Sequence, residues 1–264
     1  MEFIESQRTM LEVCVDSVES GMEACQGGAD RIELCGNLII GGTTPELSLF
    51  RILKRETDIP INVMIRPRYG DFCYTEYEFE IMKQSIQDFI NAGAGGFVFG
   101  ILEPDGCLDV ARMNELKDMI GNRRMTLHRC IDMCRDMEQA LEDAIATGFD
   151  TILTSGGRNQ CTDGMEELKR LHTLADGRID IMAGSGVDAD VIPLIHQGTG
   201  ITSFHMSGKI VADSQMKYRK RDVSMGIGAM DEYKNNPDGQ KRSCQSEERS
   251  DGQQPNNSIG GRNE

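Results

Sequence analysis

The sequence contains neither a long apolar run nor an excess of positive charge. No stretch of its 264 residues approaches the ~20 apolar residues of a membrane span, and the opening MEFIESQRTM has no apolar segment of signal-peptide length. Lys and Arg number 28 against 43 Asp and Glu, which gives a formal charge of −15 and a surface that repels phosphate backbones and anionic lipids. We therefore expect a cytoplasmic protein with no nucleic acid partner and no membrane partner.

The nine cysteines do not form a disulfide framework or a strong metal motif. Their number is odd, and they are scattered through strand-like and loop-like segments of a chain without an export signal. Cys130 and Cys134 are four residues apart, which is not the C-x-x-C spacing of a strong metal site. We expect reduced thiols.

Short β-rich runs recur at eight points, and most are separated by segments of helical periodicity. Strands that alternate with helices at a spacing of ~25–30 residues predict a parallel sheet, and eight such units predict a single (β/α)₈ TIM barrel of the α/β class. A doubly wound open sheet is the alternative. The predicted strands are 10–15, 31–34, 61–66, 96–100, 125–129, 151–154, 179–183 and 201–206, and the predicted helices are 45–56, 76–92, 110–120, 137–146, 165–174 and 188–196.

Cap residues mark several of the predicted helix ends. Thr43 and Thr44 stand before Pro45, the order expected of a cap followed by proline in the first turn, and Asp188 leads another helix in the same role. Gly148 stands where a helix should end. These positions agree with the periodicity.

The chain changes character near residue 226. Residues 1–226 carry the barrel pattern, whereas 227–264 are rich in Asn, Gln, Ser, Gly and charged residues and are predicted to be a disordered tail. No segment with a clear apolar stripe follows the eighth strand, so a covering helix is missing there. We expect the outer faces of the first and eighth strands to expose residues such as Ile201 or Phe204, and therefore expect a homo-oligomer.

Charged residues interrupt strands that should be apolar throughout. Parallel strands are buried on both faces, and an unpaired charge is expensive to bury, so such residues need partners or a ligand. Barrels of this class bind ligands at the carboxyl ends of their strands. An internal salt-bridge network that fills the barrel is the alternative reading. The interrupting residues are Glu12, Arg31, Glu33, Arg66 and His128.

The strand ends supply candidates for catalysis on a small anion, a phosphate or carboxylate metabolite. Paired arginines favour bidentate capture of such groups, and a histidine beside a cation and a carboxylate suits acid or base work. Glycine-rich turns after the last three strands would direct N–H groups toward one point. The catalytic candidates are Glu12, Glu33, His128 and Asp132; the binding candidates are Arg31, Arg66, Arg68, Asp71, Arg129, Ser155, Gly156, Gly184, Ser185, His205 and Ser207.

Two cysteines are candidates for a soft metal. Cys14 and Cys35 end neighbouring strands with the same parity as Glu12 and Glu33, so their thiols are expected near one another at the barrel mouth. Thiolates select Cu(I) over harder ions, whereas a free cysteine is more often a small buried hydrophobe. A borderline or hard divalent site built from Glu12, Glu33, His128 and His205 is a third reading.

Six segments together resemble the CutC family, which is named for copper homeostasis. They are LEVCVDSVESGMEACQGGADRIELCGNLIIGGTTP, INVMIRPRYGDFCY, GFVFGILEPDG, TLHRCID, ILTSGG and FHMSGK, in order along the chain. The resemblance implies a barrel, a cytoplasmic location and frequent oligomers; the family takes its name from copper tolerance, and the resemblance does not settle a catalysed reaction. Departures are Gly184-Ser185-Gly186, where a run of glycines is usual, and the loss of the terminal helix after DVSMG and DEY.

Two functions follow as hypotheses. The first is a copper homeostasis protein that binds Cu(I) through Cys14 and Cys35, and the second is a barrel enzyme that acts on a small anionic metabolite. Neither calls for an organic cofactor.

Overall fold

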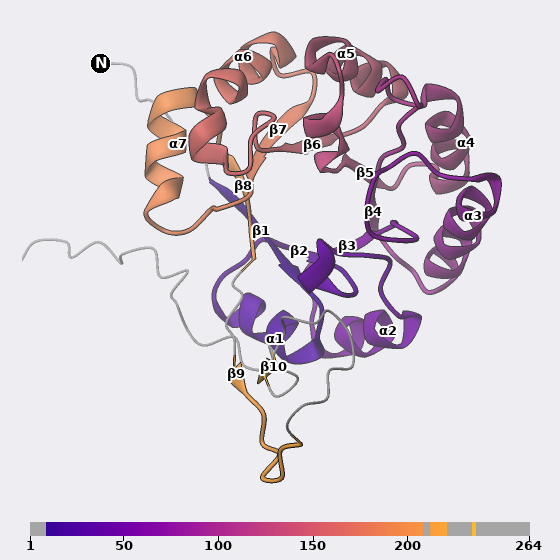
Figure 1. Ribbon diagram of the computed structural model, residues 1–264, viewed down its shortest axis with the longest axis vertical. Coiled ribbons are helices and arrows are strands. Elements are labelled where there is room, and N and C mark those ends of the chain that lie inside the picture. The colour runs from indigo at the N-terminus through magenta and orange to yellow at the C-terminus, as the bar shows by residue number, and fades with distance from the viewer. Residues whose placement is uncertain (1–8, 208–211, 221–233, 236–264) are drawn as a thin grey trace, which may run out of the picture.

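Eight parallel strands close into a barrel, and helices cover its outside (Figure 1). The structure is a computed structural model that describes residues 9–207, 212–220 and 234–235. Each strand of the barrel pairs with the next in the sequence, and β8 pairs with β1. The predicted (β/α)₈ barrel is confirmed, and the open doubly wound sheet is excluded.

The elements alternate along the chain as the pattern predicts. The barrel strands are β1 (Met10–Val15), β2 (Arg31–Leu34), β3 (Ile61–Met64), β4 (Gly96–Phe99), β5 (Arg124–Leu127), β6 (Thr151–Thr154), β7 (Asp180–Gly184) and β8 (Ser203–Met206). The helices are α1 (Val18–Gln26), α2 (Leu47–Glu56), α3 (Glu76–Asn91), α4 (Val110–Ile120), α5 (Met137–Thr147), α6 (Met165–Ala175) and α7 (Val191–Thr199). A pair of two-residue strands, β9 (Ala212–Asp213) and β10 (Lys234–Asn235), stands apart from the barrel.

Helix α1 was not among the predicted helices. Its buried residues are Gly21 and Ala24, so it has no apolar stripe that periodicity could detect. Its start is nevertheless encoded locally, because the hydroxyl of Ser17 accepts from the backbone N–H of Ser20 and the hydroxyl of Ser20 accepts from the N–H of Ser17.

The predicted cap of α2 is wrong. The helix begins at Leu47, and the residue before it, Glu46, makes no side-chain cap bond. The hydroxyl of Thr44 instead accepts from the backbone N–H of Arg66, 2.9 Å away, where β3 leaves the barrel. The hydroxyl of Thr43 contacts Asn37 and the carbonyl of Gly36. Thr43 thus bonds within the loop that follows β2, and Thr44 ties this loop to the end of β3.

The other two helix signals fit the structure more closely. Asp188 accepts from the N–H groups of Asp190 and Val191 at the start of α7, but the helix begins three residues later than predicted and its cap residue is Asp190, which makes no side-chain cap bond. Gly148 ends α5 in the left-handed conformation, as expected of a C-terminal cap.

The main apolar cluster lies between the strands and the helices and contains Ile201 and Phe204. Both side chains are 0% exposed, so the prediction that they lie open on the outer face of the barrel is wrong. The reason is that they pack into this cluster. These two residues therefore give no support to the predicted homo-oligomer, which remains a prediction.

Two further expectations from the sequence concern the C-terminal tail and the absence of membrane-spanning segments. The tail at 227–264 and the DVSMG and DEY segments lie outside the described residues, apart from Lys234 and Asn235. Among the described helices, none has the length and apolarity that a membrane crossing requires.

Candidate functional site

The pairing register turns a set of reactive side chains toward the barrel axis. Residues directly paired on neighbouring parallel strands face the same side of the sheet. Glu12 of β1 pairs with Arg31 of β2 and with His205 of β8, and Cys14 pairs with Glu33. These residues therefore share the barrel interior, where an apolar filling would be usual.

Glu12 and Arg31 form an ion pair deep in the barrel. The Glu12 carboxylate is fully buried and accepts from Arg31 Nε and, at 3.4 Å, from the amide of Asn62. Burial raises the pKa of Glu12, and the opposing charges of Arg31 and His205 do not overcome it. Arg31 therefore takes part in an internal salt bridge, as the alternative interpretation of the charged strand residues predicts.

Glu33 and His205 form a second pair one layer closer to the mouth. His205 Nε2 lies 2.9 Å from Glu33 Oε2 and 3.9 Å from Glu12 Oε1. Burial by itself would lower the pKa of His205, but the Glu33 carboxylate and then Cys14 raise it well above its usual value. Burial would likewise raise the pKa of Glu33, but His205 outweighs it and holds the value below normal. Both pKa shifts favour the ionic form of the pair.

The thiols of Cys14 and Cys35 adjoin this pair. Ligand atoms of Cys14, Glu33 and His205 all lie within 4.8 Å of one another. The Cys35 thiol donates to Glu33 Oε2 over 3.5 Å, and burial followed by the charge of Glu33 raises the pKa of Cys35 well above its usual value. The two cysteines belong to one small interior cluster with Leu38, Met64 and Val98.

A pocket of about 370 Å³ opens above this cluster at the carboxyl ends of the strands. It brings together nine of the predicted site residues, which come from strands and loops around the barrel. Its lining residues include Cys14, Glu33, Cys35, Met64, Arg66, Phe72, His128, Arg129, Leu153, Ser185, Asp188, His205, Met206 and Ser207.

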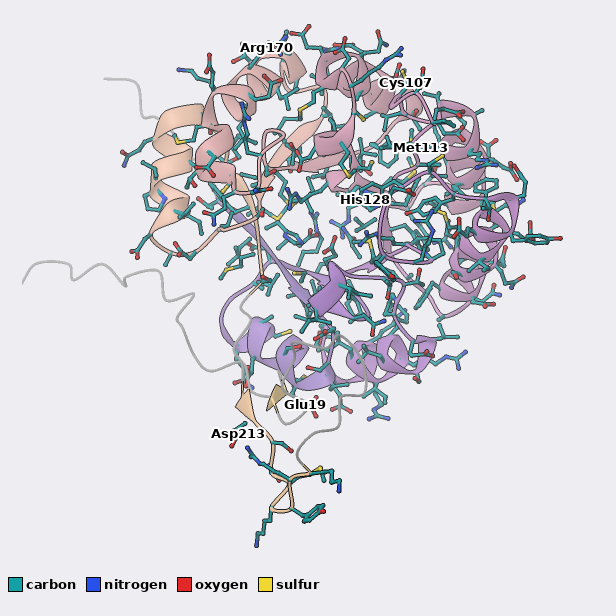
Figure 2. The ribbon with its side chains drawn as sticks, viewed as in Figure 1. Glu19, Cys107, Met113, His128, Arg170 and Asp213 are labelled. Carbon is teal, nitrogen blue, oxygen red and sulfur yellow. The ribbon has the colours of Figure 1, made fainter. Side chains whose placement is uncertain are left out.

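His128 closes one wall of the pocket. Its ring faces the inside of the strand ring (Figure 2) and is 3% exposed. Its Nδ1 accepts from the backbone N–H of Cys130, while its Nε2 is buried without a partner. Burial, and then the charge of Arg66, lowers the pKa of His128 to about 4, so the ring is neutral near pH 7.

Arg66 also lines the pocket, but most of its donors are engaged. Its two terminal nitrogens donate to the backbone carbonyls of Gly41, Gly42 and Gly70 at 2.8–3.2 Å. The guanidinium thereby fastens the loops that follow β2 and β3 to each other. Its Nε remains buried without a partner.

Arg68 and Asp71 lie outside the pocket. Arg68 donates to Glu78 and Asp71 and to the carbonyls of Tyr69, Asp71 and Cys73. Asp71 is largely exposed, and the pairing lowers its pKa. The structure therefore places these two residues in a surface loop contact, which is the competing interpretation of the pair.

Asp132 is saturated by the loop that follows β6. Its carboxylate accepts from the backbone N–H groups of Ser155 and Gly157 and from the hydroxyls of Thr154 and Ser155. Arg129 Nε donates to it as well, over 2.7 Å. An acid or base needs a free face toward its substrate, and Asp132 has none in this arrangement.

The glycines of the turns after β6 and β7 are required because a side chain there would clash with neighbouring atoms. Gly156 has φ +69°, and a Cβ there would lie 2.3 Å from the carbonyl oxygen of Gly164. A Cβ on Gly184 would lie 2.5 Å from a methyl group of Leu153, so this glycine leaves room inside the barrel. Ser185 and Ser207 line the pocket, although the hydroxyl of Ser185 donates to the carbonyl of Asn159.

Sequence reasoning missed Met64 and Phe72 as site residues. Met64 has the inward parity of Asn62 on β3, and that spacing is visible in the sequence. Phe72 comes from the loop after β3, and its ring centroid lies 4.6 Å from that of His128. No local pattern predicts the position of Phe72, because the loop alone decides it.

The fold and the site define a (β/α)₈ barrel protein with a sulfur-containing cluster inside the barrel. The chain belongs to the CutC family, whose model matches residues 9–210. It is 44% identical over 217 residues to the copper homeostasis protein cutC homolog of Homo sapiens, covering 82% of this chain and 80% of that protein. It is 40% identical over 228 residues to a CutC family protein of Vibrio campbellii, covering 85% and 92%.

A solved structure agrees with this assignment. The crystal structure of a CutC protein from Streptococcus agalactiae matches with a TM-score of 0.72 and 29% identity, covering 75% of this chain and 97% of that one. The resemblance found in the six sequence segments is thereby confirmed.

Proposed function

We propose that this protein serves copper homeostasis by binding Cu(I) inside the barrel through the thiolates of Cys14 and Cys35. The observation that carries the proposal is the interior cluster in which both cysteines meet Met64 beside Glu33 and His205. Thiolates and thioethers are the ligands that favour Cu(I), so the donor set fits this ion. The relatives described as copper homeostasis proteins support the same function.

The hard or borderline divalent reading has weaker support. Glu33 Oε2 is engaged by both His205 and Cys35, and the nearest approach of Glu12 to His205 is 3.9 Å. His128 is not part of the cluster whose ligand atoms lie within 4.8 Å of one another. A hard ion would have to displace an existing ion pair to gain oxygen ligands.

The Glu33 and His205 pair would assist the thiols without holding copper directly. Their charges cancel inside the barrel, so a Cu(I) bound by two thiolates would add one net negative charge, which the positive His205 ring stabilises. The cytoplasm is the proposed location, because the eight cysteines among the described residues are all free.

The test is a titration of reduced protein with Cu(I) against a chromophoric Cu(I) chelator under anaerobic conditions. We expect one tightly bound Cu(I) per chain in the native protein and loss of that binding in a Cys14→Ala, Cys35→Ala double variant. A Cys25→Ala, Cys107→Ala double variant removes two thiols outside the interior cluster and is the matched control. A parallel titration with Zn²⁺ distinguishes the divalent reading. Equal Cu(I) affinity in both double variants would refute the proposal.

A further inference from the structure

Two half-buried cysteines, Cys107 and Cys134, stand on neighbouring loops outside the proposed copper site. Cys107 lies in the turn that follows β4, on the outer side of the strand ring beside α5 (Figure 2). Cys134 ends the short helical turn Arg129–Met133 that follows β5. Neither residue lines the pocket above Cys14 and Cys35.

A backbone hydrogen bond brings the two cysteines together. The N–H of Arg135, the residue after Cys134, donates to the carbonyl of Gly106, the residue before Cys107, over 3.1 Å. A Cβ on Gly106 would lie 3.5 Å from the Arg135 nitrogen, so the two backbones are in direct contact. Residues that face each other across hydrogen-bonded backbones have Cα atoms about 4.5–5.5 Å apart, and a disulfide spans about 4.4–6.8 Å. The backbone separation therefore suits a bridge.

The electrostatics of the two thiols indicate that the side chains approach each other as well. Burial raises the pKa of both thiols, and at Cys134 the charge of Cys107 adds to burial and brings the pKa to about 12. The carboxylate of Asp143 on α5 also raises the pKa of both. Both sulfur atoms therefore share the space between the turn after β4 and α5.

A small groove gives access to Cys107. It has a volume of about 180 Å³, and its lining includes Cys107, Arg135 and Asp143. After burial, the guanidinium of Arg135 has the largest influence on the pKa of Cys107 and opposes the rise, whereas the charges that act on Cys134 all raise its pKa. Cys107 is therefore the thiol that ionises more readily and that a small solute reaches first.

Cys130 is the competing partner for Cys134, and its position is unfavourable. Its side chain is 0% exposed and belongs to the main apolar cluster. Its sulfur points toward Gly100, where an added Cβ would lie 2.2 Å from it. The Cys134 thiol instead donates to the backbone carbonyl of Cys130 over 3.6 Å. A bridge between these two would require Cys130 to leave the core.

We propose that Cys107 and Cys134 are a site of reversible oxidation, at which hydrogen peroxide converts the two thiols into a disulfide. The Cys107 thiolate attacks one peroxide oxygen; an S–O bond forms, the O–O bond breaks, and the leaving hydroxide takes up the thiol proton as water. The Cys134 sulfur then attacks the sulfenic acid; the S–S bond forms, the S–O bond breaks, and hydroxide leaves with the Cys134 proton as a second water. The thiols lose two electrons, and the peroxide gains them.

The disulfide joins the loop after β4 to the loop after β5. The second loop begins with His128 and Arg129, which line the pocket, so the bridge fixes the outer end of a segment whose inner end forms the pocket wall. Disulfides of proteins in reducing compartments are usually transient and often serve redox sensing. The proposal does not depend on copper, because neither cysteine belongs to the interior cluster.

The test is peptide mapping of the reduced, metal-free protein after treatment with hydrogen peroxide in the presence of a metal chelator. Remaining thiols are blocked with N-ethylmaleimide, and a protease that cleaves at aspartate separates Cys130 from Cys134, because Asp132 stands between them. We expect one bridge, between Cys107 and Cys134, that dithiothreitol reverses. The same treatment in urea should distribute bridges over other cysteines, because only the fold brings these two together.

Two variants assign the roles of the thiols. In Cys134→Ser the sulfenic acid of Cys107 has no partner, so dimedone should label Cys107 and no bridge should form. Cys107→Ser should lose both the bridge and the dimedone label. Cys73→Ser removes another half-buried thiol and is the matched control, which should form the bridge at the native rate.

The Cys14→Ala, Cys35→Ala double variant should also form the bridge at the native rate, so failure of the copper proposal and failure of this one give different results. Absence of a bridge in the peroxide-treated native protein would overturn the proposal. A bridge from Cys134 to Cys130, or dimedone labelling of Cys73 equal to that of Cys107 in Cys134→Ser, would overturn it as well.

Discussion

The His205 ring nitrogen and the Glu33 carboxylate lie 2.9 Å apart inside the barrel, although 172 residues separate them in the chain. Barrel closure makes this contact, because β8 pairs with β1 and β1 pairs with β2. The two charges balance each other directly beside Cys14 and Cys35. The pair therefore links the last strand of the barrel to the proposed metal site.

Removal of one partner of this pair should destabilise the barrel. In a His205→Ala variant the Glu33 carboxylate keeps its burial and loses its counter-ion, which costs about 3–5 kcal/mol of the free energy of unfolding. Urea denaturation of the metal-free protein measures the change. His172→Ala on α6 is the control and should lose less than about 1 kcal/mol. A loss of that same small size in His205→Ala would show that the pair is not ionic.

The stability should depend on pH through His128. Its pKa is about 4 in the folded protein against 6.5 in the unfolded chain, so between these values the unfolded chain binds the extra proton. The stability present above pH 6.5 is therefore lost as the pH falls toward 4, by about 3 kcal/mol. His205 acts in the opposite sense, since its raised pKa contributes stability below pH 6.5 that is lost at higher pH.

Comparison of native protein with His128→Gln isolates the His128 contribution. Urea denaturation at several pH values between 4 and 7 should show a steeper loss of stability in the native protein than in the variant. An NMR titration of the His128 ring gives its folded pKa directly. A midpoint near 6.5 would contradict the prediction.

Copper affinity should rise with pH. Burial and Glu33 hold the pKa of Cys35 well above its usual value, so at neutral pH Cys35 is a thiol and must release its proton when it binds Cu(I). Each proton released makes the apparent affinity about tenfold tighter per pH unit. Competition titrations at pH 6, 7 and 8 measure the slope, and a pH-independent affinity would exclude Cys35 as a ligand.

Asp132 should prove a structural residue. Asp132→Ala removes an acceptor of five N–H and O–H donors in the loop after β6, and we expect a loss of about 2–4 kcal/mol in the free energy of unfolding. Asp71→Ala is the matched control, since Asp71 also stands three residues after its arginine but is largely exposed. It should lose less than about 1 kcal/mol. Equal losses would show that the loop does not depend on Asp132.

The charged residues of the strands show which parts of the site could be predicted from the sequence. Glu12, Glu33, Arg66 and His128 were identified because parallel strands are normally apolar, and all four side chains are buried in or beside the barrel interior. The same pattern did not distinguish pocket residues from loop contacts. Arg68 and Asp71 match the motif around Arg66, yet their donors and acceptors are engaged on the surface.

The sequence by itself determined the barrel, the alternation of its elements and the family. Hydrophobic periodicity and strand spacing are local properties, and eight repeats of one unit leave few ways to bury the apolar faces. Tertiary structure alone decided that His205 pairs with Glu33, that Met64 joins the two thiols, and that Phe72 lies against both Arg66 and His128. These contacts join strands and loops distant in the chain, and their geometry exists only once closure of the barrel has fixed the register between β1 and β8.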